Sequence, residues 1–183
     1  MPEHPVKAAV NEKRFRVQIK ICGLTQVEQA LQCAQLGADL IGLVFYPGSP
    51  RCVDRKRARE ISSAVGPEAA VTGVFVDETY QAVMEMVQFC GLSAVQLHGK
   101  ESPQLVRRLR NTGLMVLKAL FEVKRPFLHQ ASDYDASAIL MECGAGRLPG
   151  GNARAWDWAA AQKVIRSRPV VLAGGLNALN ISR

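Results

Sequence analysis

Short apolar segments recur along this chain at a nearly constant spacing, and this spacing limits the fold more than any other feature. Each segment has the length of a β-strand, and successive segments start about 20 to 32 residues apart, the length of one strand, one helix and their loops. Such a repeat predicts a parallel β/α architecture. The expected strands are residues 17–22, 40–45, 71–76, 94–98, 115–120, 138–142 and 170–173.

Helical periodicity fills most of the intervals between these strands. Apolar residues at helical spacing predict helices over residues 26–36, 55–65, 80–89, 103–110 and 156–166. Thr25, followed three residues later by Glu28, predicts a capping box at the start of the first helix. The interval 121–135 contains Pro126 and no clear period, so we expect an irregular crossover there.

The turn after the first strand decides between two parallel folds. A doubly wound sheet usually has a G-x-G-x-x-G turn at this point, and the sequence here is C-G-L-T, residues 22–25. We therefore predict an α/β fold of the (β/α)8 TIM-barrel type, with the eighth βα unit missing from this chain. Residues 1–16 are expected to be a loose N-terminal leader, and residues 17–183 a single barrel domain, incomplete at its C-terminus.

Composition excludes several classes of protein. The five cysteines form no C-x-x-C pair, which argues against a disulfide framework or a zinc site and favours a cytoplasmic location. No apolar run approaches the roughly 18 residues that cross a bilayer. The net charge of +7 leaves a nucleic-acid-binding module as an alternative, but the basic residues are scattered, and the densest group, residues 51–59, reads as a solvated helix face. A basic surplus also suits an enzyme whose substrate carries phosphate and carboxylate groups.

Polar side chains occur late in several expected strands, although strands covered on both faces should be apolar. We expect them to point into the barrel and to meet at its C-terminal mouth, where active sites of such barrels lie. The opposite face is the aliphatic set that includes Ala119. The inward residues expected from this alternation are Lys20, Cys22, Gln96, His98, Lys118 and Glu142.

A thiol and a carboxyl group facing each other can serve as base and acid. We expect Lys20 or Lys118 to favour the thiolate of Cys22, and burial to favour protonated Glu142. The residues alone leave structural alternatives open: Cys22 as a small buried apolar residue, Glu142 as the partner of a barrel lysine, and His98 as a hydrogen-bonded core histidine.

Two glycine pairs follow the last two expected strands. Gly150 and Gly151 lie in the loop after strand 138–142, and Gly174 and Gly175 come directly after strand 170–173. Backbone N–H groups after the seventh strand of a barrel are well placed to form half of a phosphate site.

These segments, in this order, resemble phosphoribosylanthranilate isomerase, a (β/α)8 enzyme of tryptophan biosynthesis. The matching stretches are KICGLT (20–25), GLVFYPGSPRCV (42–53), GVFVDE (73–78), VQLHGKE (95–101), LKAL (117–120), PGGNARAWDW (149–158) and VVLAGGLN (170–177). The resemblance implies an Amadori rearrangement of N-(5-phosphoribosyl)anthranilate by acid-base catalysis, an intramolecular oxidation and reduction of the aldose-ketose type, without metal or organic cofactor.

The resemblance also implies roles for individual residues. Cys22 stands where the family has its base, and Glu142 stands where the family has an aspartate as its acid. Arg51 would hold the anthranilate carboxylate, His98 would line the mouth, and the Gly174–Gly175 pair would bind the phosphate. The loop after strand 138–142 reads G-G-N-A-R where the family commonly has G-G-T-G-K.

The expected partner is a small phosphorylated substrate, with no nucleic acid and no membrane, and the expected assembly is a monomer or a homodimer. The alternative function is a truncated, inactive barrel homologue that binds phosphate ligands weakly or needs a partner chain. Three departures from the family pattern leave this alternative open: Glu142, the changed loop after strand 138–142 and the missing eighth unit.

Overall fold

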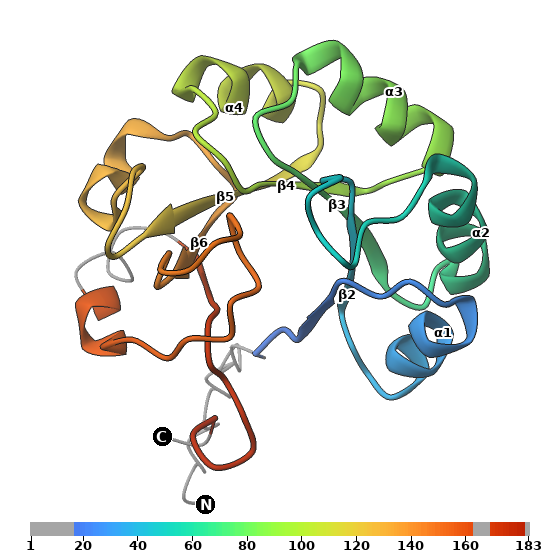
Figure 1. Ribbon diagram of the computed structural model, residues 1–183. Coiled ribbons are helices and arrows are strands. Elements are labelled where there is room, and N and C mark those ends of the chain that lie inside the picture. Colours follow the sequence, from blue (N-terminus) through green and yellow to red (C-terminus); the bar gives the residue numbers. More distant parts are fainter. Residues whose placement is uncertain (1–16, 163–168, 182–183) are drawn as a thin grey trace, which may run out of the picture.

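A parallel sheet, curled into an open barrel, organises the computed structural model, which describes residues 17–162 and 169–181 (Figure 1). Its seven strands lie in the order of the sequence, so each pairs in parallel with the next, and β1 and β7 are the edges of the sheet. The strands are β1 (Lys20–Cys22), β2 (Leu40–Val44), β3 (Ala70–Phe75), β4 (Ala94–Leu97), β5 (Met115–Phe121), β6 (Ala138–Glu142) and β7 (Val170–Leu172). The predicted α/β barrel architecture with seven strands is confirmed.

Helices cover the outer face of the sheet, as Figure 1 shows for α1 to α4. The α-helices are α1 (Val27–Gln35), α2 (Arg55–Val65), α3 (Tyr80–Cys90) and α4 (Pro103–Arg110), close to the predicted ranges. The irregular crossover contains a short 3-10 helix, η1 (Leu128–Asp133). Of the helix predicted over 156–166, the structure describes the 3-10 turn η2 (Trp158–Ala161), and residues 163–168 lie outside the described residues, as does the predicted leader 1–16.

Side-chain caps fix where three of these helices begin. Asp54, Thr79 and Ser102 each accept a hydrogen bond from the backbone N–H three residues ahead, at the starts of α2, α3 and α4 respectively. The predicted capping box of α1 is wrong, because Gln26 occupies its N-cap position and makes no side-chain cap bond. The chain turns into α1 one residue later than the Thr25–Glu28 spacing indicates.

The sheet has an apolar layer on each face. The larger layer lies between the strands and the helices and includes Ile41, Leu97 and Met141. Two smaller clusters fill the barrel interior, one around Leu117 and one around Phe121. This arrangement explains why the strands read as apolar on both faces.

Lys118 is on the opposite face of the sheet from the one we predicted. The register pairs Lys118 with Leu97 and Ile139, which both belong to the layer beneath the helices, whereas Ala119 packs in the barrel interior. The alternation of a strand gives two sets of residues without saying which set faces inward. We assigned Lys118 to the mouth because it is polar, and its partner on the helix side, Glu101, satisfies that charge instead.

Candidate active site

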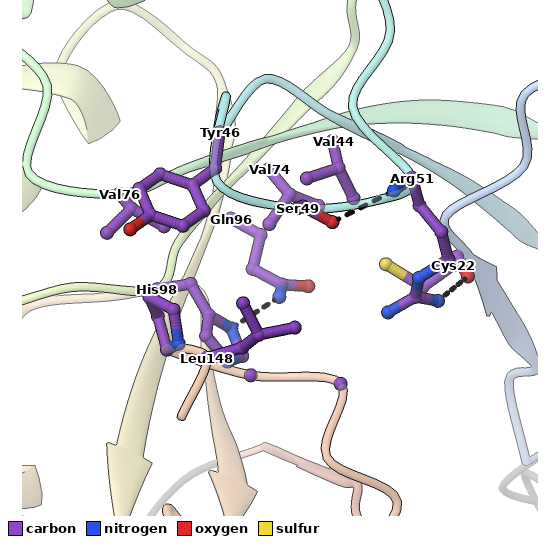
Figure 2. Close-up of a pocket in the computed structure, with 13 residues that line it drawn as sticks. Cys22, Val44, Tyr46, Ser49, Arg51, Val74, Val76, Gln96, His98 and Leu148 are labelled. Atoms are coloured by element: carbon purple, nitrogen blue, oxygen red, sulfur yellow. Dashed lines mark hydrogen bonds between the residues drawn. The ribbon is translucent and has the colours of Figure 1, made fainter. Parts of the chain in front are cut away.

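The ends of β1 and β2 bring Cys22 and Arg51 together at one side of the barrel mouth (Figure 2). Arg51 follows β2 in a tight loop, and its Nη1 donates to the backbone oxygen of Cys22 at 2.8 Å. Gly42 of β2 lies beside Cys22, where an added Cβ would be only 2.7 Å from Cys22 Sγ and 2.8 Å from Lys20 Nζ. Because Gly42 has no side chain, Cys22 and Lys20 have room to lie inside the barrel.

His98 and Glu142 meet at the other side of the mouth. His98 Nε2 lies 2.8 Å from Glu142 Oε2, and Gln96 Nε2 lies 2.7 Å from His98 Nδ1. All three side chains are buried, with exposed fractions of 6%, 6% and 2% for His98, Glu142 and Gln96. The edge of His98 also packs against the Phe121 ring, at a centroid distance of 5.5 Å. These contacts hold the imidazole in one orientation.

Glu142 is ionised more readily than we predicted. Burial works against its charge, but the hydrogen bond and the charge of His98, the N–H of Gly151 and the charge of Lys124 outweigh burial and lower the pKa of the Glu142 carboxyl below its ordinary value. Our expectation that burial would keep Glu142 protonated is therefore wrong. No local pattern indicates this shift, because His98 lies 44 residues away from Glu142 in the chain.

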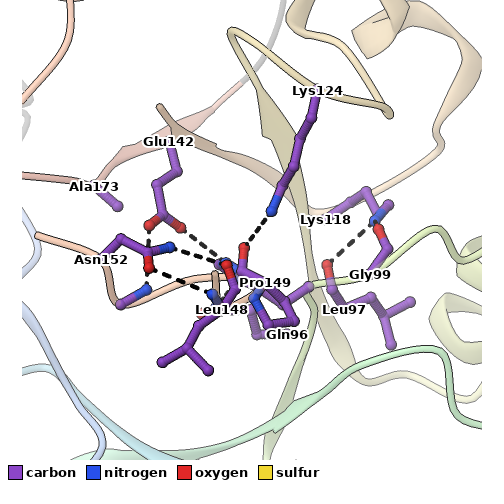
Figure 3. A network of polar contacts seen from close by, with 12 residues as sticks. Gln96, Leu97, Gly99, Lys118, Lys124, Glu142, Leu148, Pro149, Asn152 and Ala173 are labelled. Atoms are coloured by element: carbon purple, nitrogen blue, oxygen red, sulfur yellow. Dashed lines mark hydrogen bonds and ion pairs between the residues drawn. The ribbon is translucent and has the colours of Figure 1, made fainter. Parts of the chain in front are cut away.

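The loop after β6 lies across the mouth (Figure 3). Lys124 Nζ donates to the backbone oxygen of Pro149 at 2.8 Å, and burial lowers the pKa of this lysine although the Glu142 carboxylate opposes that shift. Asn152 bonds back to Leu148, closing the loop on itself. A Cβ at Gly150 would overlap His98 Nε2, so the loop backbone rests directly on the imidazole.

A single pocket connects these groups. Cys22, Arg51 and His98 line it, whereas Glu142 lies behind His98 and reaches the pocket wall through Gly151, whose N–H donates to Glu142 Oε1 at 3.3 Å. The residues that line the pocket are Cys22, Val44, Tyr46, Ser49, Arg51, Val74, Val76, Gln96, His98, Leu148, Pro149, Gly150 and Gly151. Tyr46, Ser49 and Leu148 were missed in the sequence, because they lie in loops with no periodic pattern.

The glycine pair after β7 lies beside Glu142 and not in this pocket. Gly174 and Gly175 have positive φ angles of 91° and 70°. A Cβ at Gly174 would lie 3.4 Å from Glu142 Cγ and 3.4 Å from Trp156 Cδ1. The Trp156 indole donates to the backbone oxygen of Ala173 at 2.9 Å, which fixes the turn that precedes the pair.

Lys118 takes no part in the pocket. It forms a buried ion pair with Glu101 at 2.7 Å. Figure 3 shows Lys118 beside Leu97 and Gly99, to whose backbone oxygens it donates at 3.3 and 2.8 Å. It therefore supports the loop after β4 from the helix side. Sequence analysis missed Glu101, which comes three residues after His98.

Residues 17–162 and 169–181 contain no group of three or more His, Cys, Asp or Glu side chains placed to hold a metal ion. Among the same residues, no helix is long and apolar enough to cross a membrane.

Comparison with known proteins gives one family. The sequence model of the family described as N-(5'phosphoribosyl)anthranilate (PRA) isomerase matches residues 19–183. A relative from Desulfatibacillum aliphaticivorans, named N-(5'-phosphoribosyl)anthranilate isomerase, is 47% identical over 169 residues, covering 92% of this chain and 78% of the relative.

Solved structures agree with the sequence matches. The phosphoribosyl anthranilate isomerase of Thermus thermophilus superimposes with a TM-score of 0.81 at 33% identity, covering 91% of this chain and 80% of that one. A phosphoribosyl anthranilate isomerase in complex with reduced 1-(o-carboxyphenylamino)-1-deoxyribulose 5-phosphate gives a TM-score of 0.78 at 34% identity, with the same coverage of 91% and 80%.

Proposed function

Because this chain belongs to the phosphoribosylanthranilate isomerase family, we propose that it converts N-(5-phosphoribosyl)anthranilate into 1-(2-carboxyphenylamino)-1-deoxyribulose 5-phosphate in tryptophan biosynthesis. The observation that carries the proposal is the pocket itself. A thiol, a guanidinium and an imidazole from β1, the loop after β2 and the end of β4 line it, and a buried carboxylate is bonded to the imidazole.

The reaction needs one acid and one base. An acid gives a proton to the ribose ring oxygen, the bond from that oxygen to C1 breaks, and an iminium forms at C1. A base then removes the proton from C2, giving an enolamine, which becomes the ketone when O2 loses its proton and C1 gains one. Since C2 is oxidised and C1 reduced by the same amount, the electrons balance within the substrate and no redox cofactor is required.

Cys22 is the base in this proposal and Glu142 the acid. They lie on β1 and β6: Cys22 lines the pocket, and Glu142 lies one hydrogen bond behind its wall, which His98 and Gly151 form. The ionised state that His98 favours in Glu142 means that the carboxyl must be supplied with a proton before each turnover.

Substrate binding in this proposal uses groups that surround Cys22 and Glu142. The Arg51 guanidinium has five N–H donors, of which one is used by Cys22, and the rest suit the planar anthranilate carboxylate. The Gly174–Gly175 turn is proposed to bind the phosphate through backbone N–H groups. His98 lines the pocket beside the sugar.

A fluorescence assay tests the function. Anthranilate is coupled to phosphoribosyl pyrophosphate in situ, and loss of the substrate signal is followed with wild type, Cys22→Ser and Cys33→Ser, each checked for folding by circular dichroism. Cys33 lies on α1, outside the pocket, and is the matched control. We expect turnover by wild type and Cys33→Ser and none by Cys22→Ser. A folded wild type without turnover would refute the proposal and favour an inactive homologue.

The remaining expectations belong to the same proposal. We expect the protein to act in the cytoplasm on a small phosphorylated molecule, as a monomer or a homodimer, and to bind neither nucleic acid nor membranes. Light scattering tests the oligomeric state, and a salt-dependent retention assay on DNA tests nucleic-acid binding.

A further inference from the structure

Gln96 is a buried polar side chain to which the proposed reaction gives no role. It lies on β4, lines the pocket and is 2% exposed. Its Nε2 is bonded to His98 Nδ1, whereas its Oε1 is buried and has no hydrogen-bond partner among the residues that the structure describes. Figure 2 shows this side chain between His98 and Cys22. A buried acceptor without a partner costs free energy, so its position calls for a ligand.

The bond to His98 has a direction. A side-chain amide nitrogen only donates, so His98 Nδ1 must be the acceptor of the 2.7 Å bond, and a neutral imidazole then carries its proton on Nε2. That nitrogen lies 2.8 Å from Glu142 Oε2. The hydrogen bonds therefore run one way, from Gln96 to His98 to Glu142.

Among the described residues, Gln96 is the group that sets the direction of these hydrogen bonds at His98. The titratable or charged groups around the ring are Glu142 on β6, Lys124 beside Glu142, and the pocket residues Tyr46, Cys22 and Arg51. Among the described residues, the ring is hydrogen-bonded to Glu142 at Nε2 and to Gln96 at Nδ1.

We propose that Gln96 is a positioning residue, which fixes the His98 tautomer that donates to Glu142, and that its carbonyl oxygen accepts a hydrogen bond from a hydroxyl or N–H group of the substrate. The inference rests on the proposed function for the identity of that substrate. Gln96 thus connects the acid side of the pocket to the bound sugar. The tautomer itself depends on the protein alone.

Nitrogen NMR tests the tautomer without any turnover. The chain has three histidines, so the double variant His4→Gln/His129→Gln, labelled with 15N-histidine, leaves His98 as the single signal. At about pH 8 we expect a protonated Nε2 and a bare Nδ1. Gln96→Glu should reverse this pattern, because its carboxylate accepts a proton at Nδ1. A protonated Nδ1 in the unsubstituted pocket, whether the ring is neutral or charged, overturns the proposal.

Thr72→Val is the matched control. Thr72 is buried on the neighbouring strand β3, its Oγ1 has no partner among the described residues, and it does not line the pocket. We expect this substitution to leave the His98 signal and turnover unchanged within about twofold. If Thr72→Val changes the tautomer as Gln96→Glu does, the effect is one of general packing and Gln96 has no special role.

Kinetics tests the substrate contact. Gln96→Leu removes both bonds and should lower kcat/KM by about 100-fold, whereas Gln96→Glu keeps an acceptor and should lower kcat with KM within about threefold of wild type. A Gln96→Leu enzyme as active as wild type refutes the contact. If the wild type itself is inactive, the proposed function fails, and the NMR result still decides whether Gln96 sets the tautomer.

Discussion

Lys118 Nζ lies 2.7 Å from Glu101 Oε2, and both side chains are sealed from solvent, with exposed fractions of 0% and 1%. The pair is on the helix side of the sheet, behind the pocket. Glu101 also accepts hydrogen bonds from the backbone N–H groups of Gly99 and Asp77, so it joins the loops after β3 and β4. His98 immediately precedes Gly99, and the pair therefore supports the backbone on which the imidazole is mounted.

Breaking this pair should destabilise the fold. Lys118→Met leaves the Glu101 carboxylate buried without its cation, and we expect the free energy of unfolding to fall by about 3–5 kcal/mol, measured by urea titration. Lys100→Met, which changes an exposed lysine in the same loop, should change it by less than about 0.5 kcal/mol. Glu101→Gln added to Lys118→Met should recover part of the loss. Equal stabilities of the two single variants would show that the pair does not hold the loops.

The lowered pKa of Glu142 predicts a pH-dependent contribution to stability. Because the folded pKa lies below the ordinary value of 4.5, the carboxylate stabilises the fold fully above that pH, and the stabilisation is lost as the pH falls through the lowered pKa. The difference in unfolding free energy between wild type and Glu142→Gln should therefore shrink as the pH falls below 4.5. Urea titrations at a series of pH values measure it, and a constant difference would contradict the lowered pKa of Glu142.

The loop after β6 should tolerate no side chain at Gly150. Its backbone rests on His98, so a methyl group in Gly150→Ala must displace either the loop or the imidazole from Glu142. We expect turnover to fall about 10- to 100-fold, since a shift of about 1 Å at an acid-base site has that effect, while the thermal midpoint changes little. Arg147→Ala, at an exposed position of the same loop, is the control. Wild-type turnover in Gly150→Ala would mean that the loop moves away at no cost.

Arg51→Lys should weaken substrate binding more than it slows chemistry. A lysine keeps the positive charge but cannot donate two parallel hydrogen bonds to a carboxylate, and it cannot also reach the backbone oxygen of Cys22 in the same geometry. We expect KM to rise about 10-fold or more with kcat within about threefold of wild type. Steady-state kinetics separates the two. A fall in kcat at unchanged KM would instead assign Arg51 to the reacting atoms.

The elements of this fold were predictable because their signals are local. Apolar runs, helical periods and glycine stops lie within each βα unit, and β6, α2 and α4 have the bounds that these signals predict. The capping box of α1 was a local error, whereas the two errors at buried charges concern partners distant in the sequence. Lys118 faces the helices because its ion-pair partner, Glu101, lies on that side of the sheet. The pKa of Glu142 is lowered mainly by its hydrogen bond to His98 and the charge of His98. A single sequence gives the alternation of a strand, but the partner of each buried charge depends on which loops the barrel brings together.

The last prediction concerns Glu142, at a position where the family resemblance implies an aspartate in other members. Both carboxylate oxygens of Glu142 are hydrogen-bonded: Oε2 lies 2.8 Å from His98 Nε2, and Oε1 accepts from the Gly151 N–H at 3.3 Å. The length of the glutamate side chain allows both contacts. Glu142→Asp withdraws the carboxyl group by one methylene, so it loses at least the His98 bond, and a displacement of about 1 Å costs on the order of 100-fold in rate. We therefore expect kcat of Glu142→Asp to fall by about that factor, with KM little changed, in the fluorescence assay. Asp157→Glu, an exposed carboxylate outside the pocket, should leave kcat unchanged. If Glu142→Asp is instead faster than wild type, the site is built for the shorter acid, and the glutamate is a weakening departure.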